Sequence, residues 1–97
     1  MVLTDKEKIY LKAIPLSDYN DGDQWKDGGG VWCFSVTDQI TEYTPQQAKG
    51  VMSSLVKKGL INIMDYEGGG RPEDMCVGLT LEGVQALKNL LEELETN

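Results

Sequence analysis

The sequence predicts an α+β fold made of a three-helix core, a two-stranded hairpin and a C-terminal helix, and three observations predict it. The segments Thr4–Glu7 and Thr44–Gln47 both have the residue pattern of a helix capping box. Gly59 ends the second of these helices, and two short segments rich in strand formers follow on either side of a Gly-rich turn. Leucines then recur at steps of three and four residues. A chain of 97 residues has room for one such domain, residues 1–97.

The first helix is expected over residues 5–14. At its start, the Thr4 hydroxyl and the Glu7 carboxylate can each accept a hydrogen bond from a backbone N–H group. Pro15 disfavours helical geometry at the residue before it, so the helix should end near Ile14. A narrow apolar stripe at helical spacing comprises Ile9, Tyr10, Ala13 and Ile14.

Residues 16–30 are expected to form an acidic, Gly-rich and mobile loop, because Asp, Asn and Gly favour turns. Trp25 is the side chain that can anchor this loop on the core. A calcium loop with ligands from Asp18, Asn20 and Asp23 is an alternative. Its register is wrong, since the Gly falls at the fifth position from Asp18 and no Glu closes the loop at the twelfth. A solvated loop is therefore favoured.

The next segment contains a short apolar run, Val31–Phe34, which suits a buried strand or an aromatic anchor. Ser35 or Thr37 then provides a cap for a short helix, expected over residues 36–41. A tight turn over residues 41–43 would lead into the following helix.

That helix is expected over residues 45–58, with Thr44 as its cap and Pro45 at its first position. The spacing predicts a buried face of Ala48, Val51, Met52, Leu55 and Val56. The opposite face carries Gln46, Gln47, Lys49, Gly50, Ser53, Ser54 and Lys57. Gly59 suits the left-handed end of the helix, and Lys57 and Lys58 lie where the helix dipole favours cations.

Hairpin strands are expected near residues 60–66 and 76–79, around a Gly-rich tip at 67–75. Thr80 can cap the last helix, residues 81–94, whose apolar stripe comprises Leu81, Val84, Leu87, Leu90, Leu91 and Leu94. This stripe is wider than one small core can bury, so a homodimer through the C-terminal helix is expected. The alternative is that the stripe packs on the first helix.

Composition makes an enzyme improbable. The chain has no His, the usual general base at neutral pH, and neither Cys33 nor Cys76 has a basic neighbour within two residues that would activate its thiol. Two distant Cys without His predict no metal site, and both thiols are expected to be reduced and buried. The Gly runs lack the context of a phosphate-binding loop, so no cofactor is expected. No segment has the length of a membrane span or the pattern of a signal peptide, which predicts a cytoplasmic protein.

Two motifs, SSLVKKGLI at Ser53–Ile61 and LTLEG at Leu79–Gly83, resemble winged helix-turn-helix domains, most nearly the MarR-like bacterial regulators. The resemblance covers about half the chain. It implies a transcription regulator whose recognition helix, 45–58, enters the major groove of double-stranded DNA while the wing, 67–75, contacts the backbone or minor groove. By that resemblance the DNA-binding residues are Gln46, Gln47, Lys49, Gly50, Ser53, Ser54 and Lys57, with Arg71 in the wing.

The chain departs from this family in two ways. Gly69 stands where the family commonly has an Asp, two residues before the wing Arg. Family members also carry extra helices for dimerisation at both ends, whereas this sequence predicts one helix on each side.

The distribution of charge supports a second function class. The formal net charge is −7, and only the segment 44–66 is basic, with Lys49, Lys57 and Lys58 against Asp65. A surface that follows phosphates usually carries more cations than this. The alternative is an acidic protein-interaction module, of the kind found in small phage or accessory proteins, that uses the same fold to bind a basic protein partner or to mimic nucleic acid.

Overall fold

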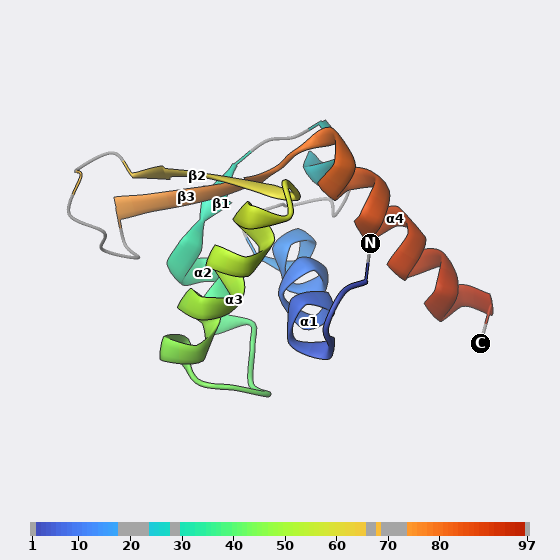
Figure 1. The fold of residues 1–97 in the computed structure, drawn as a ribbon, viewed down its shortest axis with the longest axis horizontal. Helices are drawn as coiled ribbons and strands as arrows, with labels where there is room; N and C mark the ends of the chain where they lie inside the picture. The colour runs from blue at the N-terminus through green and yellow to red at the C-terminus, as the bar shows by residue number, and fades with distance from the viewer. Residues whose placement is uncertain (1, 18–23, 28–29, 66–67, 69–73, 97) are drawn as a thin grey trace.

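The computed structural model describes residues 2–17, 24–27, 30–65, 68 and 74–96. In this part the chain is α+β, with four α-helices and a three-stranded antiparallel sheet (Figure 1). The elements in chain order are α1 (Asp5–Ala13), the 3₁₀ turns η1 (Ile14–Leu16) and η2 (Gln24–Asp27), β1 (Val31–Trp32), α2 (Cys33–Asp38), α3 (Pro45–Lys57), β2 (Ile61–Asp65), β3 (Met75–Leu79) and α4 (Leu81–Thr96).

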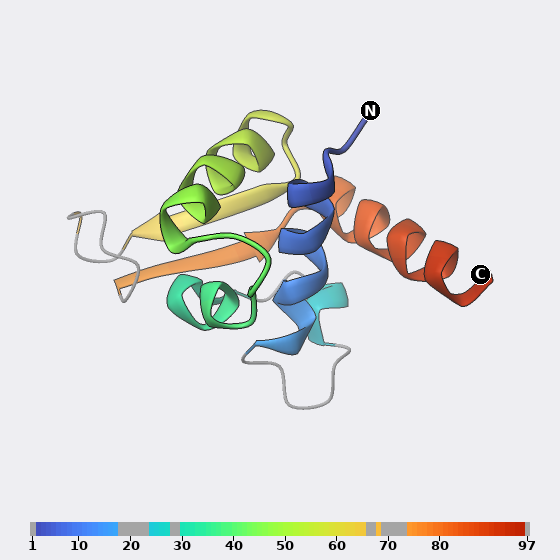
Figure 2. The same cartoon turned by 90° about the horizontal axis from the view of Figure 1, so that it is seen from below.

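The sheet has the strand order β1-β3-β2, so the last strand lies between the other two. Val77 of β3 is opposite Val31 of β1 on one side and Ile63 of β2 on the other. In Figure 1, α1, α2 and α3 all lie on the same side of the sheet. Seen from below in Figure 2, α3 and α2 flank the β2–β3 hairpin. These helices bury one face of the sheet in a shared core.

The expected starts of α1 and α3 are confirmed. At α1, the Thr4 backbone N–H donates to Glu7 Oε1 over 2.8 Å, and the Glu7 N–H donates to Thr4 Oγ1 over 3.1 Å. At α3, Thr44 and Gln47 form the same reciprocal pair over 3.1 and 3.2 Å. Gly59 has a φ of 74°, which is the left-handed end that only Gly adopts without strain.

The segment 31–41 differs from the prediction. Only Val31 and Trp32 form a strand, and α2 begins at Cys33 rather than at residue 36 and ends at Asp38. Trp32 caps the helix without a side-chain hydrogen bond, so no capping residue marked this start. An early helix places Cys33 and Val36, three residues apart, together in the core, and this packing decides the boundary.

Two apolar residues that the spacing predicted to be buried, Val56 and Leu81, are exposed. Val56 is 42% exposed, because it stands about a quarter turn from the centre of the buried arc of α3. Leu81 is 86% exposed, since the buried arc of α4, which runs over Gly83, Val84, Leu87 and Leu90, is centred near Leu87, about a third of a turn away. In α1 the stripe is wider than predicted, because Glu7 and Leu11 are buried as well as Tyr10, Ala13 and Ile14.

The C-terminal helix packs on its own chain. Leu87 and Leu90 are buried, Leu91 is half-buried against the core, and α4 contacts α1. The apolar surplus that led to the expected homodimer is therefore smaller than the sequence suggested, while the dimer itself stays a prediction. In the described chain, no helix combines the length and the apolar character that a membrane crossing requires.

The loop 16–30 is described only in part. Trp25 in η2 is buried in the core, as expected for the anchor of this loop. The three candidate calcium ligands, Asp18, Asn20 and Asp23, lie outside the described residues.

Candidate nucleic-acid interface

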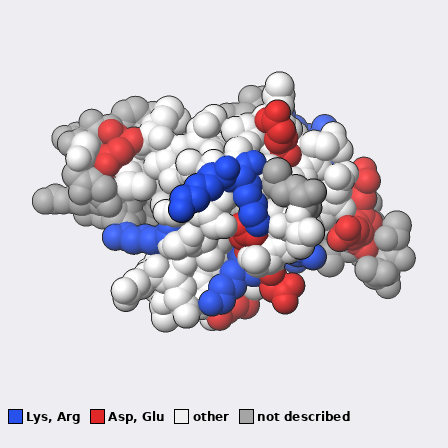
Figure 3. All heavy atoms as spheres, viewed as in Figure 1, with Lys and Arg blue, Asp and Glu red and all other residues white. Residues whose placement is uncertain are grey.

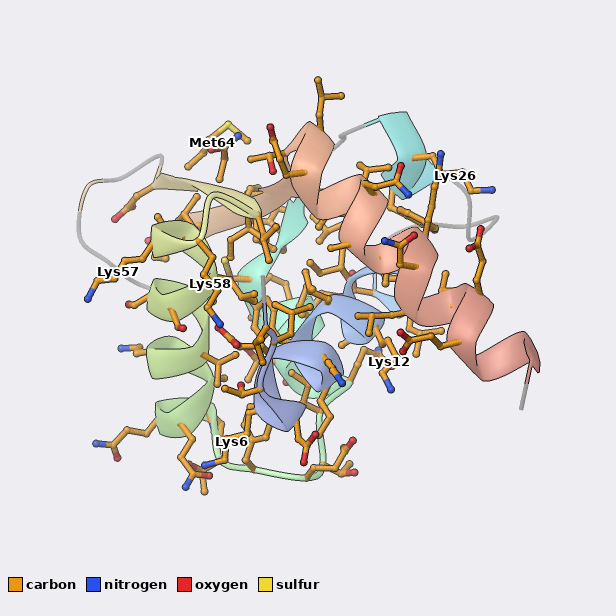
Figure 4. The ribbon with its side chains drawn as sticks, turned by 45° about the vertical axis from the view of Figure 1, so that its right-hand side comes forward. Lys6, Lys12, Lys26, Lys57, Lys58 and Met64 are labelled. Carbon is orange, nitrogen blue, oxygen red and sulfur yellow. The ribbon has the colours of Figure 1, made fainter. Side chains whose placement is uncertain are left out.

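The outward face of α3 carries most of the residues that the family resemblance named as DNA-binding. Gln46, Lys49, Gly50, Ser53 and Lys57 are all exposed. A Cβ at Gly50 would meet no atom within 4 Å, so nothing in the described structure covers the middle of this face. Figure 4 shows the Lys57 side chain directed away from α3, into solvent. We refer to these five residues as the α3 face.

Gln47 has a different local role. Its side-chain oxygen accepts the hydrogen bond from the Thr44 backbone N–H that completes the capping box. The residue is exposed, but its oxygen is already engaged in holding the first turn of α3. We therefore leave it out of the α3 face.

Ser54 does not face outward, which corrects the prediction. Its hydroxyl donates to Glu7 Oε2 of α1 over 2.6 Å, and the residue is only half-buried. Position 54 lies on the side of α3 that packs against α1, so the hydroxyl is used for helix–helix contact. Arg71, predicted to lie in the wing, falls outside the described residues.

Among the described residues one carboxylate is buried, although nothing in the charge pattern of the sequence predicts it. Glu7 is almost fully buried, and Lys58 Nζ donates to its Oε1 over 2.6 Å. Burial by itself raises the pKa of Glu7, but the hydrogen bonds from Lys58, Ser54 and Thr4 outweigh it and bring the pKa to about 2. The sequence indicated a role for Glu7 in the capping box but not its ion pair, because the partner Lys58 is 51 residues away.

This ion pair changes the electrostatics of α3. Lys58 also donates to the Val2 carbonyl oxygen over 2.9 Å, so its ammonium group is held against α1 (Figure 4). On the face shown in Figure 3, lysines gather over α3 and α1 with acidic side chains among them. Segment 44–66 contains three cations, Lys49, Lys57 and Lys58. With Lys58 paired to Glu7, Lys49 and Lys57 are the two that belong to the α3 face.

The two motifs behind the family resemblance meet at one junction. Thr80 Oγ1 donates to the Gly59 carbonyl oxygen over 2.6 Å and accepts from the Gly83 N–H over 3.0 Å. The Thr80 N–H donates to the Leu60 carbonyl oxygen over 3.1 Å. These bonds join the end of α3, the start of β2 and the start of α4, and so fix the direction in which the hairpin leaves α3.

A groove of about 940 Å³ lies beside the α3 face, between α2, α3 and the β2–β3 hairpin. Its apolar lining comes from Cys33, Phe34, Met52, Ile63 and Met75. Its polar lining includes Asp38 of α2, Asp65 of β2 and three members of the α3 face, Gln46, Lys49 and Ser53. The groove and the α3 face are therefore adjoining surfaces that share side chains.

Comparison of the chain with protein-family models, with curated proteins and with solved structures gave no match.

Burial limits the reactivity of the two cysteine thiols. Neither Cys33 nor Cys76 forms a disulfide, and both side chains are buried, as expected. Burial, and then the proximity of Cys76, raise the pKa of the Cys33 thiol to about 11, so this thiol stays protonated at neutral pH and is a poor nucleophile. In the described ranges, no three His, Cys, Asp or Glu side chains are grouped so as to hold a metal ion.

Proposed function

We propose that this protein is a winged helix-turn-helix DNA-binding protein that acts as a transcription regulator. In this proposal α3 is the recognition helix, and residues 67–75 form the wing. The order helix, strand, helix, helix, strand, strand and the sheet order β1-β3-β2 are compatible with such a domain. The observation that carries the proposal is the α3 face, which is polar, uncovered and next to the hairpin.

The side chains of the α3 face suit contact with a DNA major groove. An amide such as that of Gln46 can bind an adenine edge through two hydrogen bonds, and a hydroxyl such as that of Ser53 can bind several base edges. Gly50 and Ser53 are small, which lets the helix backbone approach the bases closely. Lys49 and Lys57 are available for phosphate oxygens.

The small number of cations sets the expected strength and salt dependence of binding. With Lys58 paired to Glu7, the phosphate contacts come from Lys49, Lys57 and, in the wing, Arg71. Two or three neutralised phosphates correspond to a slope of about −2 to −3 in log affinity against log salt concentration. We expect binding that is measurable at low salt and much weaker at physiological salt.

Fluorescence anisotropy with a labelled mixed-sequence duplex tests this proposal. Wild-type protein should bind at low salt, and Lys49→Ala and Arg71→Ala should each weaken binding and reduce the salt slope by about one. Lys88→Ala is the matched control, because Lys88 is an exposed lysine on α4, away from α3. Absence of duplex binding at low salt, or an equal loss in the Lys88 variant, would overturn the proposal.

A further inference from the structure

The α3 face has a different neighbour on each side, the β2–β3 hairpin on one and α1 on the other. Lys49 and Met52 of α3 line the groove that the hairpin borders. On the opposite flank of α3, Ser54 and Lys58 both donate to the Glu7 carboxylate of α1. A helix in the major groove of DNA has a phosphate backbone on each side, since each strand forms one border of the groove. With α3 in the groove, one backbone runs past the hairpin and the other past α1.

Lys6 is the residue of α1 that is tied to the start of α3. The hydroxyl of Tyr43, which directly precedes the cap residue Thr44, donates to the Lys6 backbone carbonyl oxygen over 2.9 Å. Lys6 is exposed, and Figure 4 shows its side chain on the side of α1 that is nearer the start of α3. The Tyr43 hydrogen bond therefore places an exposed lysine of one helix next to the first turn of the other.

The Lys6 ammonium group is available to a ligand, whereas that of Lys58 is not. Lys58 is paired to the buried Glu7 carboxylate over 2.6 Å. The Lys6 side chain makes no ion pair or hydrogen bond with any residue that the structure describes. Asp5 precedes Lys6 on α1, but at about 100° per residue it lies about 200° around the helix from Glu7, which faces α3. The Glu42 carboxylate accepts from the Thr41 N–H and hydroxyl, over 3.0 and 3.1 Å.

We propose that Lys6 binds a phosphate of the DNA strand that borders the major groove on the α1 side. This inference rests on the proposed function, because it requires α3 to be the recognition helix. One further neutralised phosphate changes the expected slope of log affinity against log salt concentration to about −3 to −4. A phosphate contact carries no sequence information, but contacts on both sides of α3 fix the orientation of this helix in the groove.

Fluorescence anisotropy over a series of salt concentrations, with the labelled mixed-sequence duplex, tests this contact. Lys6→Ala should weaken binding about three- to fivefold at low salt, as expected for one exposed ion pair, and reduce the salt slope by about one. Lys6→Arg should keep the affinity and the slope of wild type, because it retains the charge. Thermal unfolding of each variant verifies that it is folded.

Lys12→Ala is the matched control, because it removes the same charge from the same helix. Figure 4 shows the Lys12 side chain on the other side of α1 from α3. This variant has the same net charge as Lys6→Ala, so a difference between the two reports the position of the lysine rather than the charge of the whole chain. We expect Lys12→Ala to bind the duplex nearly as wild type does.

The outcomes separate this inference from the proposed function. Wild-type protein that binds no duplex at low salt overturns both. If wild type binds and Lys49→Ala weakens binding, but Lys6→Ala loses no more affinity than Lys12→Ala, the Lys6 contact alone is refuted. Equal losses in Lys6→Arg and Lys6→Ala would also refute it, because the charge at position 6 would then make no difference.

Discussion

The backbone carbonyl oxygen of Leu60 occupies the space next to the Cα of Gly83, so closely that a Cβ at position 83 would lie 1.9 Å from it. The obstacle is backbone rather than a flexible side chain, so α4 would have to shift away from the start of β2. Any residue other than Gly at this position therefore disturbs the junction at which Thr80 bonds to Gly59 and Gly83.

We expect Gly83→Ala to lower the free energy of unfolding by about 1–3 kcal/mol, the usual cost of forcing extra atoms into a packed site. Urea denaturation measures this. Gly50→Ala is the matched control, since Gly50 is also a helical Gly but a Cβ there meets nothing within 4 Å. The Gly50→Ala variant should be more stable than wild type by about 0.5–1 kcal/mol, because Ala has a higher helix propensity than Gly. Equal effects of the two substitutions would contradict the close contact.

The buried pair of Glu7 and Lys58 makes stability depend on pH. The pKa of Glu7 is about 2 in the folded chain against 4.5 for the free group, so the unfolded state takes up a proton first as the pH falls. The stabilisation is fully present above about pH 4.5 and is lost between there and about pH 2. This difference in pKa corresponds to about 3 kcal/mol.

Denaturation at several pH values, on wild type and on Glu7→Gln, isolates this contribution from that of the other carboxylates. The difference in unfolding free energy between the two proteins should be largest near neutral pH and should shrink between about pH 4.5 and 2. The Gln side chain keeps hydrogen-bonding atoms but not the charge. A difference that stays constant over this range would show that Glu7 does not titrate with a lowered pKa.

The buried hydroxyl of Tyr10 should contribute nothing to the stability of the fold. Tyr10 is fully buried, and its hydroxyl finds no hydrogen-bond partner within the part of the chain that the structure describes. Burial raises the pKa of Tyr10, so the group is neutral at all working pH values. Tyr10→Phe should therefore leave the unfolding free energy unchanged or raise it, because the cost of an unpaired polar atom disappears.

Tyr43 is the matched control for this substitution, because its hydroxyl donates to the Lys6 carbonyl oxygen over 2.9 Å. Tyr43→Phe should cost about 0.5–1.5 kcal/mol, the usual net value of one hydrogen bond. Thermal or urea unfolding compares the two. A larger loss in Tyr10→Phe than in Tyr43→Phe would mean that the buried hydroxyl is satisfied.

The sequence allowed prediction of the elements whose signals are local. The capping boxes at Thr4 and Thr44 and the left-handed Gly59 lie within a few residues of the backbone groups they satisfy, so pattern alone located them. The start of α2 was not predictable in this way, because burial of Cys33 and Val36 in the shared core decides it. Such packing depends on elements distant in the sequence.

In the candidate site too, features set by local spacing were predictable from the sequence, and features set by distant contacts were not. Helical spacing placed Gln46, Lys49 and Ser53 on an exposed face, and they are exposed. The role of Ser54 and the neutralisation of Lys58 depend on Glu7, which is 47 and 51 residues away from them, and no local pattern indicates that partner. The groove likewise needs α2 and the hairpin beside α3, which only the three-dimensional arrangement reveals.

The contrast between an exposed residue and one bonded to α1 predicts how two polar residues of α3, Gln46 and Ser54, affect DNA binding. Gln46 is exposed on the α3 face, whereas Ser54 donates its hydroxyl to Glu7. With a duplex of preferred sequence, Gln46→Ala should reduce discrimination against a changed base pair by about 1–3 kcal/mol and leave stability unchanged. Ser54→Ala should do the reverse, lowering stability by about 1–3 kcal/mol through the lost bond to a buried carboxylate, with the same base discrimination.

Anisotropy titrations on a set of singly substituted duplexes, together with urea unfolding of each variant, measure both quantities. Gln47→Ala serves as a third case, because its oxygen holds the capping box at Thr44. We expect it to cost about 1 kcal/mol of stability, as the loss of a helix cap does. If Ser54→Ala changes base preference more than Gln46→Ala, the face of α3 that meets DNA is the one toward α1, and the orientation proposed for the recognition helix is wrong.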